Sequence, residues 1–225
     1  MKASEVSARA RLEPEERRRQ LVDVAAKLLA KGGLDALQFT DLAAAAGVTR
    51  PVVYKFFSTR EALVEAILSD FEAELAARFH AAARTASASS FAEATGVFID
   101  AICDAIEAKG PGAWELLGGH GPDAEAARLG RAAQARLMRP WRTSIAAATG
   151  ASKREVETVT AMLVAAGRAV LERWYRGELS RAEAARDATR GVSALLAAFA
   201  GDAPDPIRRR PFESIRARDT RRRRS

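Results

Sequence analysis

The sequence predicts an all-α protein: an N-terminal three-helix head with a helix-turn-helix motif, followed by a C-terminal helical bundle, assembled as a homodimer. Three observations predict this fold. Apolar residues recur at helical spacing along most of the chain, a glycine turn joins two short helices in the first quarter, and no segment has the alternating pattern of a strand. We divide the chain into the head (residues 1–60), a helical body (61–203) and a basic disordered tail (204–225).

The first helix of the head is predicted by apolar side chains that repeat with the i, i+3, i+4, i+7, i+8 pattern. They are Leu21, Val24, Ala25, Leu28 and Leu29. The Gly32-Gly33 pair follows this pattern and is expected to end the helix.

The segment from Phe39 to Phe57 predicts two short helices joined by a tight turn. Gly47 stands where the chain must leave the first helix, because glycine adopts the left-handed conformation at little steric cost. Thr49 is then expected to cap the second helix through its hydroxyl, and Pro51 falls in the first turn, where a missing N–H costs nothing. This order is that of a helix-turn-helix, whose second helix can lie in the major groove of DNA.

A long helix is expected to lead from the head into the body. Ser58 and Glu61 form a predicted capping box at its start. Apolar residues then follow at four-residue intervals: Leu63, Ile67, Phe71, Leu75 and Phe79.

The rest of the body shows further helical patterns, separated by breaks rich in Gly, Pro and Ser. A helix over residues 123–150 contains Pro140, which is expected to kink or interrupt it. The last two helices begin at the predicted caps Ser152, which forms a capping box with Glu155, and Ser180.

The helix near residues 156–171 carries no charged residue on any face from Thr158 to Gly167. A helix that is apolar all round is normally buried all round, yet the last helices of a small helical domain lie at its surface. We therefore expect a homodimer in which this helix and the helix at residues 181–200 pack against their two-fold copies. The expected contact residues are Ala161, Val164, Ala165, Leu195 and Phe199. The alternative is an interior helix of a monomer.

Composition excludes several classes of protein. Hydrophobic residues make up 48% of the chain, so a core can form without disulfides, and the single Cys103 cannot form an internal bridge. The first 20 residues are polar and charged, unlike a secretory signal, and no apolar run reaches the roughly 18–20 residues that span a bilayer. We expect a cytoplasmic protein with no membrane partner.

The net charge of +7 is unevenly distributed. Residues 1–60 hold 11 Lys and Arg against 7 Asp and Glu, residues 61–205 hold 16 against 20, and residues 206–225 hold 9 against 2. A basic head suits contact with DNA phosphates, whereas an acidic body is kept away from DNA. The alternative explanation of this Arg-rich composition is a GC-rich genome.

No pattern of catalytic residues is present, and we expect no enzyme, no metal and no cofactor. The histidines His80 and His120 are isolated in the sequence, without a cluster at metal-ligand spacing. G-x-S-x-G, P-loop and dinucleotide-binding patterns are absent.

Several segments together resemble the TetR family of bacterial transcriptional regulators. The resemblance runs from about Arg17 to Leu68. Its most specific parts are AAKLLAKG at residues 25–32, Asp41-Leu42-Ala43 through Gly47-Val48, VYKFF at residues 53–57 and REAL at residues 60–63. The remainder resembles the family only in length and helical content. The resemblance also implies dimerisation through the two C-terminal helices.

The resemblance implies roles for side chains on the second helix of the motif and near it. Arg50 would meet base edges, where it could bond guanine O6 and N7, and Val52 would touch a thymine methyl. Contacts to phosphate are implied for Thr49, Tyr54, Lys55 and Arg60, and contact to a phosphate or a base for Thr40.

Two positions depart from the family pattern. Phe56 stands where many members have a base-reading histidine, so a hydrogen bond is lost there, and core packing is the alternative role. Gln38 occupies a position often filled by a capping Ser or Thr.

A small-molecule effector of unknown identity is expected to bind among large side chains of the body, since ligand pockets are apolar with few polar groups. The candidates are Trp114, Met138, Trp141 and Trp174. The alternative for a helical Trp is plain core packing, and His120 is expected to be solvated.

These observations together predict a ligand-responsive transcriptional regulator, a repressor that binds a palindromic site in double-stranded DNA as a dimer. One alternative is a DNA-binding regulator or activator without a ligand, whose body would hold no enclosed cavity. The other is a helical interaction module whose head has lost sequence-specific DNA binding.

Overall fold

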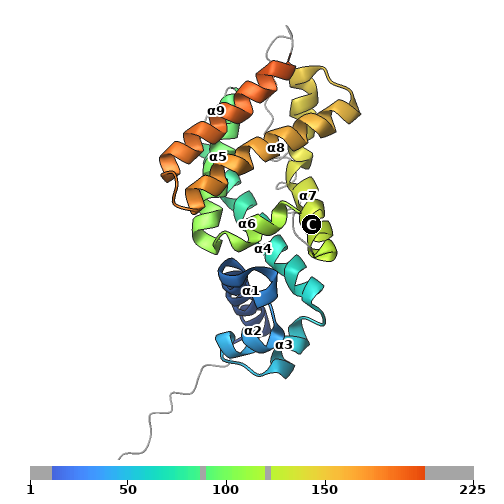
Figure 1. Cartoon of the computed structure of the whole chain (residues 1–225), viewed down its shortest axis with the longest axis vertical. Coiled ribbons are helices and arrows are strands. Elements are labelled where there is room, and N and C mark those ends of the chain that lie inside the picture. Colours follow the sequence, from blue (N-terminus) through green and yellow to red (C-terminus); the bar gives the residue numbers. More distant parts are fainter. Residues whose placement is uncertain (1–11, 87–89, 120–122, 201–225) are drawn as a thin grey trace, which may run out of the picture.

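The computed structural model describes residues 12–86, 90–119 and 123–200, and these residues form helices and no strand (Figure 1). The all-α prediction is therefore confirmed. The helices are α1 (Pro14–Gly32), the 3₁₀ helix η1 (Gly33–Ala36), α2 (Phe39–Ala46), α3 (Arg50–Phe56), α4 (Arg60–Thr85), α5 (Phe91–Lys109), α6 (Gly112–Leu117), α7 (Ala124–Thr149), α8 (Lys153–Tyr175) and α9 (Arg181–Phe199). The predicted basic tail and His120 lie outside the described residues.

Figure 1 shows an elongated arrangement, with α1, α2 and α3 at one end and α8 and α9 at the other. Helix α4 extends from the first group toward the second, so the head and the body share one long helix. A single buried cluster also joins them, since it contains Leu21 of α1, Val53 of α3, Phe71 of α4 and Leu171 of α8. The division at residue 60 stays an interpretation, because this cluster crosses it.

Most predicted helix boundaries agree with the structure. Ser152 and Ser180 each begin a helix with a complete capping box. The capping box predicted at Ser58 is wrong, because the N-cap of α4 is Thr59, whose hydroxyl accepts a hydrogen bond from the backbone N–H of Ala62 at 3.2 Å. The helix thus begins one residue later than predicted, and Glu61 does not stand three residues after the cap.

Pro140 does not interrupt α7, which continues from Ala124 to Thr149. A proline inside a helix removes one backbone hydrogen bond and costs about 3 kcal/mol. Burial on both sides offsets this cost, since Ala133 before the proline and Ile145 after it are each at most 2% exposed.

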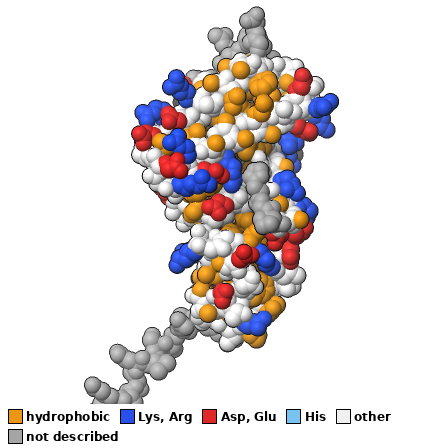
Figure 2. All heavy atoms as spheres, in the orientation of Figure 1, with side chains coloured by type: hydrophobic (Ala, Val, Ile, Leu, Met, Phe, Trp, Pro, Cys, Tyr) orange, Lys and Arg blue, Asp and Glu red, His pale blue; other side chains and the backbone are white. Residues whose placement is uncertain are grey.

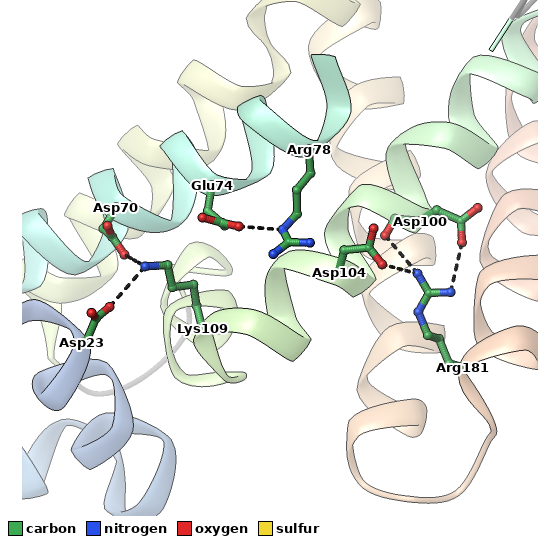
Figure 3. A network of polar contacts seen from close by, with 8 residues as sticks. All are labelled: Asp23, Asp70, Glu74, Arg78, Asp100, Asp104, Lys109 and Arg181. Carbon is green, nitrogen blue, oxygen red and sulfur yellow. Dashed lines mark hydrogen bonds and ion pairs between the residues drawn. The ribbon is translucent and has the colours of Figure 1, made fainter. Parts of the chain in front are cut away.

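A partly buried ion-pair network connects the head to the body (Figure 3). The Lys109 ammonium, at the end of α5, lies 3.1 Å from Asp23 of α1 and 2.9 Å from Asp70 of α4. Burial lowers the pKa of Lys109, but the hydrogen bonds to Asp70 and Asp23 outweigh it and hold the pKa above its ordinary value. Lys109 therefore stays protonated and fastens three helices together.

Candidate functional site

The turn between α2 and α3 closes through backbone hydrogen bonds at Gly47. This glycine is left-handed, with φ 66° and ψ 38°. The N–H of Val48 donates to the Ala43 carbonyl at 2.9 Å, and the N–H of Gly47 donates to the Ala44 carbonyl at 3.2 Å. This pair of bonds is a Schellman ending, which turns the chain sharply into the next helix. The helix-turn-helix predicted from the sequence is present.

The cap of α3 differs from the prediction. Thr49 is at the N-cap position, but its hydroxyl makes no capping hydrogen bond. The first turn is closed by the backbone instead, since the Thr49 carbonyl accepts from Val52 at 3.0 Å and Val53 at 3.4 Å. Thr49 is exposed, so its hydroxyl is open to another partner.

The two sides of α3 have different environments. Val53 is fully buried, Phe57 just after the helix is 2% exposed, and Phe56 packs against the main core. The position of Phe56 favours the core-packing alternative. The side chains exposed on and around α3 include Thr40, Thr49, Arg50, Tyr54 and Lys55, and Val52 is half-buried.

The Tyr54 ring is held between two neighbours on this exposed face. The Phe39 ring meets it edge-on, with 4.9 Å between ring centroids. The Arg50 guanidinium carbon lies 6.0 Å from the Tyr54 centroid, within the range of a cation–π interaction. Arg50 and Tyr54 are one helical turn apart, so their side chains share one face of α3. We call the exposed face formed by Thr40, Thr49, Arg50, Tyr54 and Lys55 the α3 face.

Arg60 lies beside the body. Its guanidinium is 3.4 Å from the carboxylate of Asp123, the N-cap of α7, and both side chains are about one-third exposed. The implied phosphate contact of Arg60 stays a prediction, and Asp123 is a competing partner for it.

Arg18 is a basic side chain that the sequence-based prediction missed. It is exposed on α1, and its guanidinium carbon lies 5.4 Å from the ring centroid of Phe57. The signal was the triple arginine at residues 17–19. Arg18 thus adds a positive charge near the end of α3.

The body contains an apolar pocket that opens to solvent, and the empty space in and around it, open solvent included, is about 810 Å³. Its walls come from six helices: α4, α5, α6, α7, α8 and α9. Three of the four predicted side chains line it, namely Trp114, Met138 and Trp141. Trp174 does not line the pocket and instead packs against the main core, as the alternative for a helical Trp supposed.

Aromatic side chains form one wall of the pocket. The Trp141 ring lies 5.0 Å from Phe98 and 5.7 Å from Phe91 between ring centroids. The sequence-based prediction placed Phe91 and Phe98 on a helix but gave them no role in the pocket. Their helical spacing shows only that they share a face of α5, and the packing of α5 against α7 determines what that face meets.

Polar groups in the pocket are few, and two of them have no partner. Thr95 and Trp114 are 4% and 7% exposed, and within the described part of the chain neither the Thr95 hydroxyl oxygen nor the Trp114 Nε1 has a hydrogen-bond partner. Arg168 is engaged on all three nitrogens: Nη1 donates to the Trp114 carbonyl, Nη2 to the Glu115 carbonyl and Nε to the Glu172 carboxylate, each within 3.1 Å. The pocket therefore presents unpaired donors but no free charge at Arg168.

Helix α6 contacts both the pocket and the head. Trp114 lines the pocket, while Gly112 lies against α1 so closely that a Cβ there would be 2.8 Å from the Ala30 backbone nitrogen. On the far side, a Cβ at Gly130 of α7 would be 1.9 Å from the Leu116 carbonyl oxygen. Helix α6 is thus clamped between the head and α7.

The outer surface of α8 and α9 is apolar, and Figure 2 shows hydrophobic side chains gathered over these helices. Met162 and Phe199 are 45% and 42% exposed, and Ala161 and Ala165 are exposed as well. Val164 was expected in the same surface, but it lines the pocket because it lies one turn from the pocket residues Thr160 and Arg168. Leu195 is half-buried against a second core cluster. The homodimer itself stays a prediction.

Residues 12–86, 90–119 and 123–200 hold no group of three or more His, Cys, Asp or Glu placed to bind a metal ion. None of their helices is long and apolar enough to cross a bilayer.

Comparison with known proteins places the clearest similarity in the head. Residues 21–67 match the family model described as bacterial regulatory proteins, tetR family. The HTH-type transcriptional repressor KstR2 of Mycolicibacterium smegmatis is 36% identical over 95 residues. This match covers 42% of the chain and 45% of that relative, so the chain aligns with less than half of the repressor.

Solved structures share the fold over most of the chain. A tetR-family transcriptional regulator from Streptomyces coelicolor has a TM-score of 0.62 at 23% identity, covering 92% of this chain and 97% of its own. A putative transcriptional regulator from Pseudomonas aeruginosa has a TM-score of 0.64 at 18% identity, covering 87% and 97%. Similarity at this level of identity shows the fold.

Proposed function

Because the chain belongs to the TetR family of bacterial regulatory proteins, we propose that it is a transcriptional repressor that binds a palindromic operator as a homodimer and leaves it when a ligand fills the pocket. The α3 face would enter the major groove. Arg50 would read a base there, while Thr49, Tyr54 and Lys55 would contact phosphates.

The observation that carries ligand control is the placement of α6. One helix supplies Trp114 to the pocket and Gly112 to the contact with α1. A ligand that displaces Trp114 would therefore move the surface on which the head packs. In a dimer this changes the separation of the two α3 helices, which must match half-sites about 34–36 Å apart.

The pocket also favours this function over the alternative of a regulator without a ligand. A regulator without a ligand needs no pocket in its body, whereas six helices line an apolar pocket that holds two unpaired donors. An activator would use the same surfaces as a repressor, so only a measurement of transcription distinguishes the two functions.

Selection of bound fragments from the host genome tests the proposal. Fragments should share an inverted repeat, footprinting should protect both half-sites, and excess random DNA should not compete. Transcription from a promoter carrying the repeat should fall when the protein is added. Fragments without a common sequence would support the interaction-module alternative.

A further inference from the structure

We propose that the pocket binds an uncharged, mainly apolar molecule whose carbonyl or ether oxygen accepts hydrogen bonds from the Trp114 indole and the Thr95 hydroxyl. This inference rests on the proposed function, since it names the class of the regulating ligand. Two buried polar atoms of the pocket, the Thr95 hydroxyl oxygen and the Trp114 Nε1, have no hydrogen-bond partner among the residues that the structure describes.

The unpaired atoms determine the polar part of the ligand. An indole N–H can only donate, so the group that satisfies Trp114 must be an acceptor. A buried donor without a partner is unfavourable, and a ligand oxygen that pairs with it is bound preferentially over a hydrocarbon of the same shape. The Thr95 hydroxyl can donate to the same oxygen or to another one.

The charges around the pocket exclude an ionised buried group. Among the described residues that line the pocket there is no Asp or Glu, and Arg168 is the only charged one. The Arg168 side chain is 12% exposed and is paired with the Glu172 carboxylate at 3.0 Å. A carboxylate ligand would have to displace protein acceptors from Arg168 and would lose its own hydration.

The remaining walls of the pocket favour a ligand that is apolar over most of its surface. Phe91, Phe98 and Trp141 pack ring against ring along one side, and aliphatic side chains cover most of the rest. The Thr160 hydroxyl donates to its own helix, to the Val156 carbonyl at 2.6 Å, and is not a free donor. An aromatic or alicyclic ketone fits this combination of walls and donors.

Three probes of similar shape test this assignment by calorimetry on the full chain without DNA: benzophenone, diphenylmethane and 4-benzoylbenzoate. Diphenylmethane replaces the carbonyl of benzophenone with CH₂, and 4-benzoylbenzoate adds a carboxylate. We expect benzophenone to bind about tenfold more tightly than either of the others, as one satisfied buried donor would give.

Variants assign the preference to particular atoms. Trp114→Phe and Thr95→Val should each reduce the preference for benzophenone over diphenylmethane several-fold. Diphenylmethane has no carbonyl, so a change in its affinity would report a change in the shape of the pocket. The control Trp141→Phe should shift the affinities for both probes alike and leave their ratio unchanged, because the Trp141 nitrogen is not among the buried unpaired atoms.

Each contrary result overturns the assignment. Equal affinity for benzophenone and diphenylmethane would mean that the donors play no part, and tightest binding of 4-benzoylbenzoate would mean that Arg168 holds an anion. Binding of none of the three would mean that the pocket does not accept this class. If the protein prefers benzophenone over diphenylmethane but binds no operator, the proposed function is refuted and the ligand class is not. If the protein binds an operator but shows no preference for benzophenone, the ligand class is refuted and the proposed function is not.

Discussion

Gly112 of α6 lies against Ala30 of α1 at a distance that leaves no room for a side chain. A Cβ at position 112 would be 2.8 Å from the Ala30 backbone nitrogen and 3.1 Å from the Ala26 carbonyl oxygen. Both neighbours are backbone atoms within a helix, so they cannot turn aside as a flexible side chain would. This contact is the point at which the wall of the pocket meets the head.

We expect Gly112→Ala to push α6 away from α1 and lower the free energy of unfolding by about 1–3 kcal/mol, the usual cost of overpacking. It should also alter the effect of a pocket ligand on operator affinity. Gly96→Ala is the control, since its Cβ would make only ordinary contact with Thr189 at 3.7 Å and Ala favours a helix interior by about 0.5–1 kcal/mol. Urea denaturation measures both, and equal effects would show that the Gly112 contact is not tight.

We expect Arg50→Ala to lower affinity for the operator by about 1–3 kcal/mol while changing affinity for random DNA much less, because a bidentate contact to guanine discriminates by this amount. Lys55→Ala is the matched comparison. It should weaken binding to both DNAs alike and reduce the slope of log affinity against log salt by about one. Fluorescence anisotropy at several salt concentrations measures these effects. Equal loss on the two DNAs would reduce Arg50 to a phosphate contact.

We expect Asp123→Asn to strengthen binding to all DNA a few-fold if Arg60 contacts a phosphate. The Asp123 carboxylate pairs with Arg60 through Oδ2 and caps α7 through Oδ1, which accepts from Ala126 at 2.9 Å. Asparagine keeps an oxygen for the cap but removes the competing charge, and an exposed ion pair is worth at most about 1 kcal/mol. Arg60→Ala should have the opposite effect. Unchanged DNA affinity in both variants would place Arg60 in a purely structural role.

The fold was largely predictable from the sequence because helix signals are local. Gly47, Ser152 and Ser180 act through hydrogen bonds within four or five residues, and all three are as predicted. The errors at Ser58 and Thr49 concern which of two adjacent groups makes a bond, and a pattern of residue types does not distinguish them.

The pocket was less predictable because it depends on packing between helices. A large side chain at helical spacing can face a cavity or the core, and the sequence does not say which. Trp141 and Trp174 illustrate this, since both pack against the main cluster but only Trp141 also lines the pocket. The unpaired donors could be recognised only once neighbouring acceptors were known to be absent.

We expect Cys103 to make stability fall as pH rises above about 9. Burial raises the pKa of the Cys103 thiol to about 12 against the lowering effect of Arg181, from an ordinary value of 9.0. The unfolded chain then releases the thiol proton above pH 9 while the folded chain retains it. Stability from this group is fully present below pH 9 and is lost at about 1.4 kcal/mol per unit between 9 and 12.

Urea denaturation of the wild type and Cys103→Ala under reducing conditions at several pH values measures this contribution. The high pKa values of Lys109 and Tyr175 act in the same direction, but they are common to both proteins and cancel in the difference. The wild type should therefore lose stability relative to the variant above pH 9. Parallel pH profiles would show that the thiol ionises equally in both states.

We expect the protein to be a dimer that Ala165→Glu converts to a monomer. Ala161 and Ala165 are exposed one turn apart on α8, next to exposed Met162, and no charged residue lies between Thr158 and Gly167. A carboxylate at position 165 would be buried without a partner in a two-fold contact of this surface, which is strongly unfavourable. Operator affinity should decrease when the dimer is lost, since a single head contacts only one half-site.

Ala77→Glu is the control, because it adds the same charge at an exposed alanine on α4, outside α8 and α9. Sedimentation velocity at micromolar protein should show dimers of the wild type and of Ala77→Glu, and monomers of Ala165→Glu with unchanged helix content by circular dichroism. Unchanged helicity matters, because it separates loss of the contact from loss of the fold. A monomeric wild type, or an Ala165→Glu variant that still dimerises and binds the operator, would place the dimer contact on another surface.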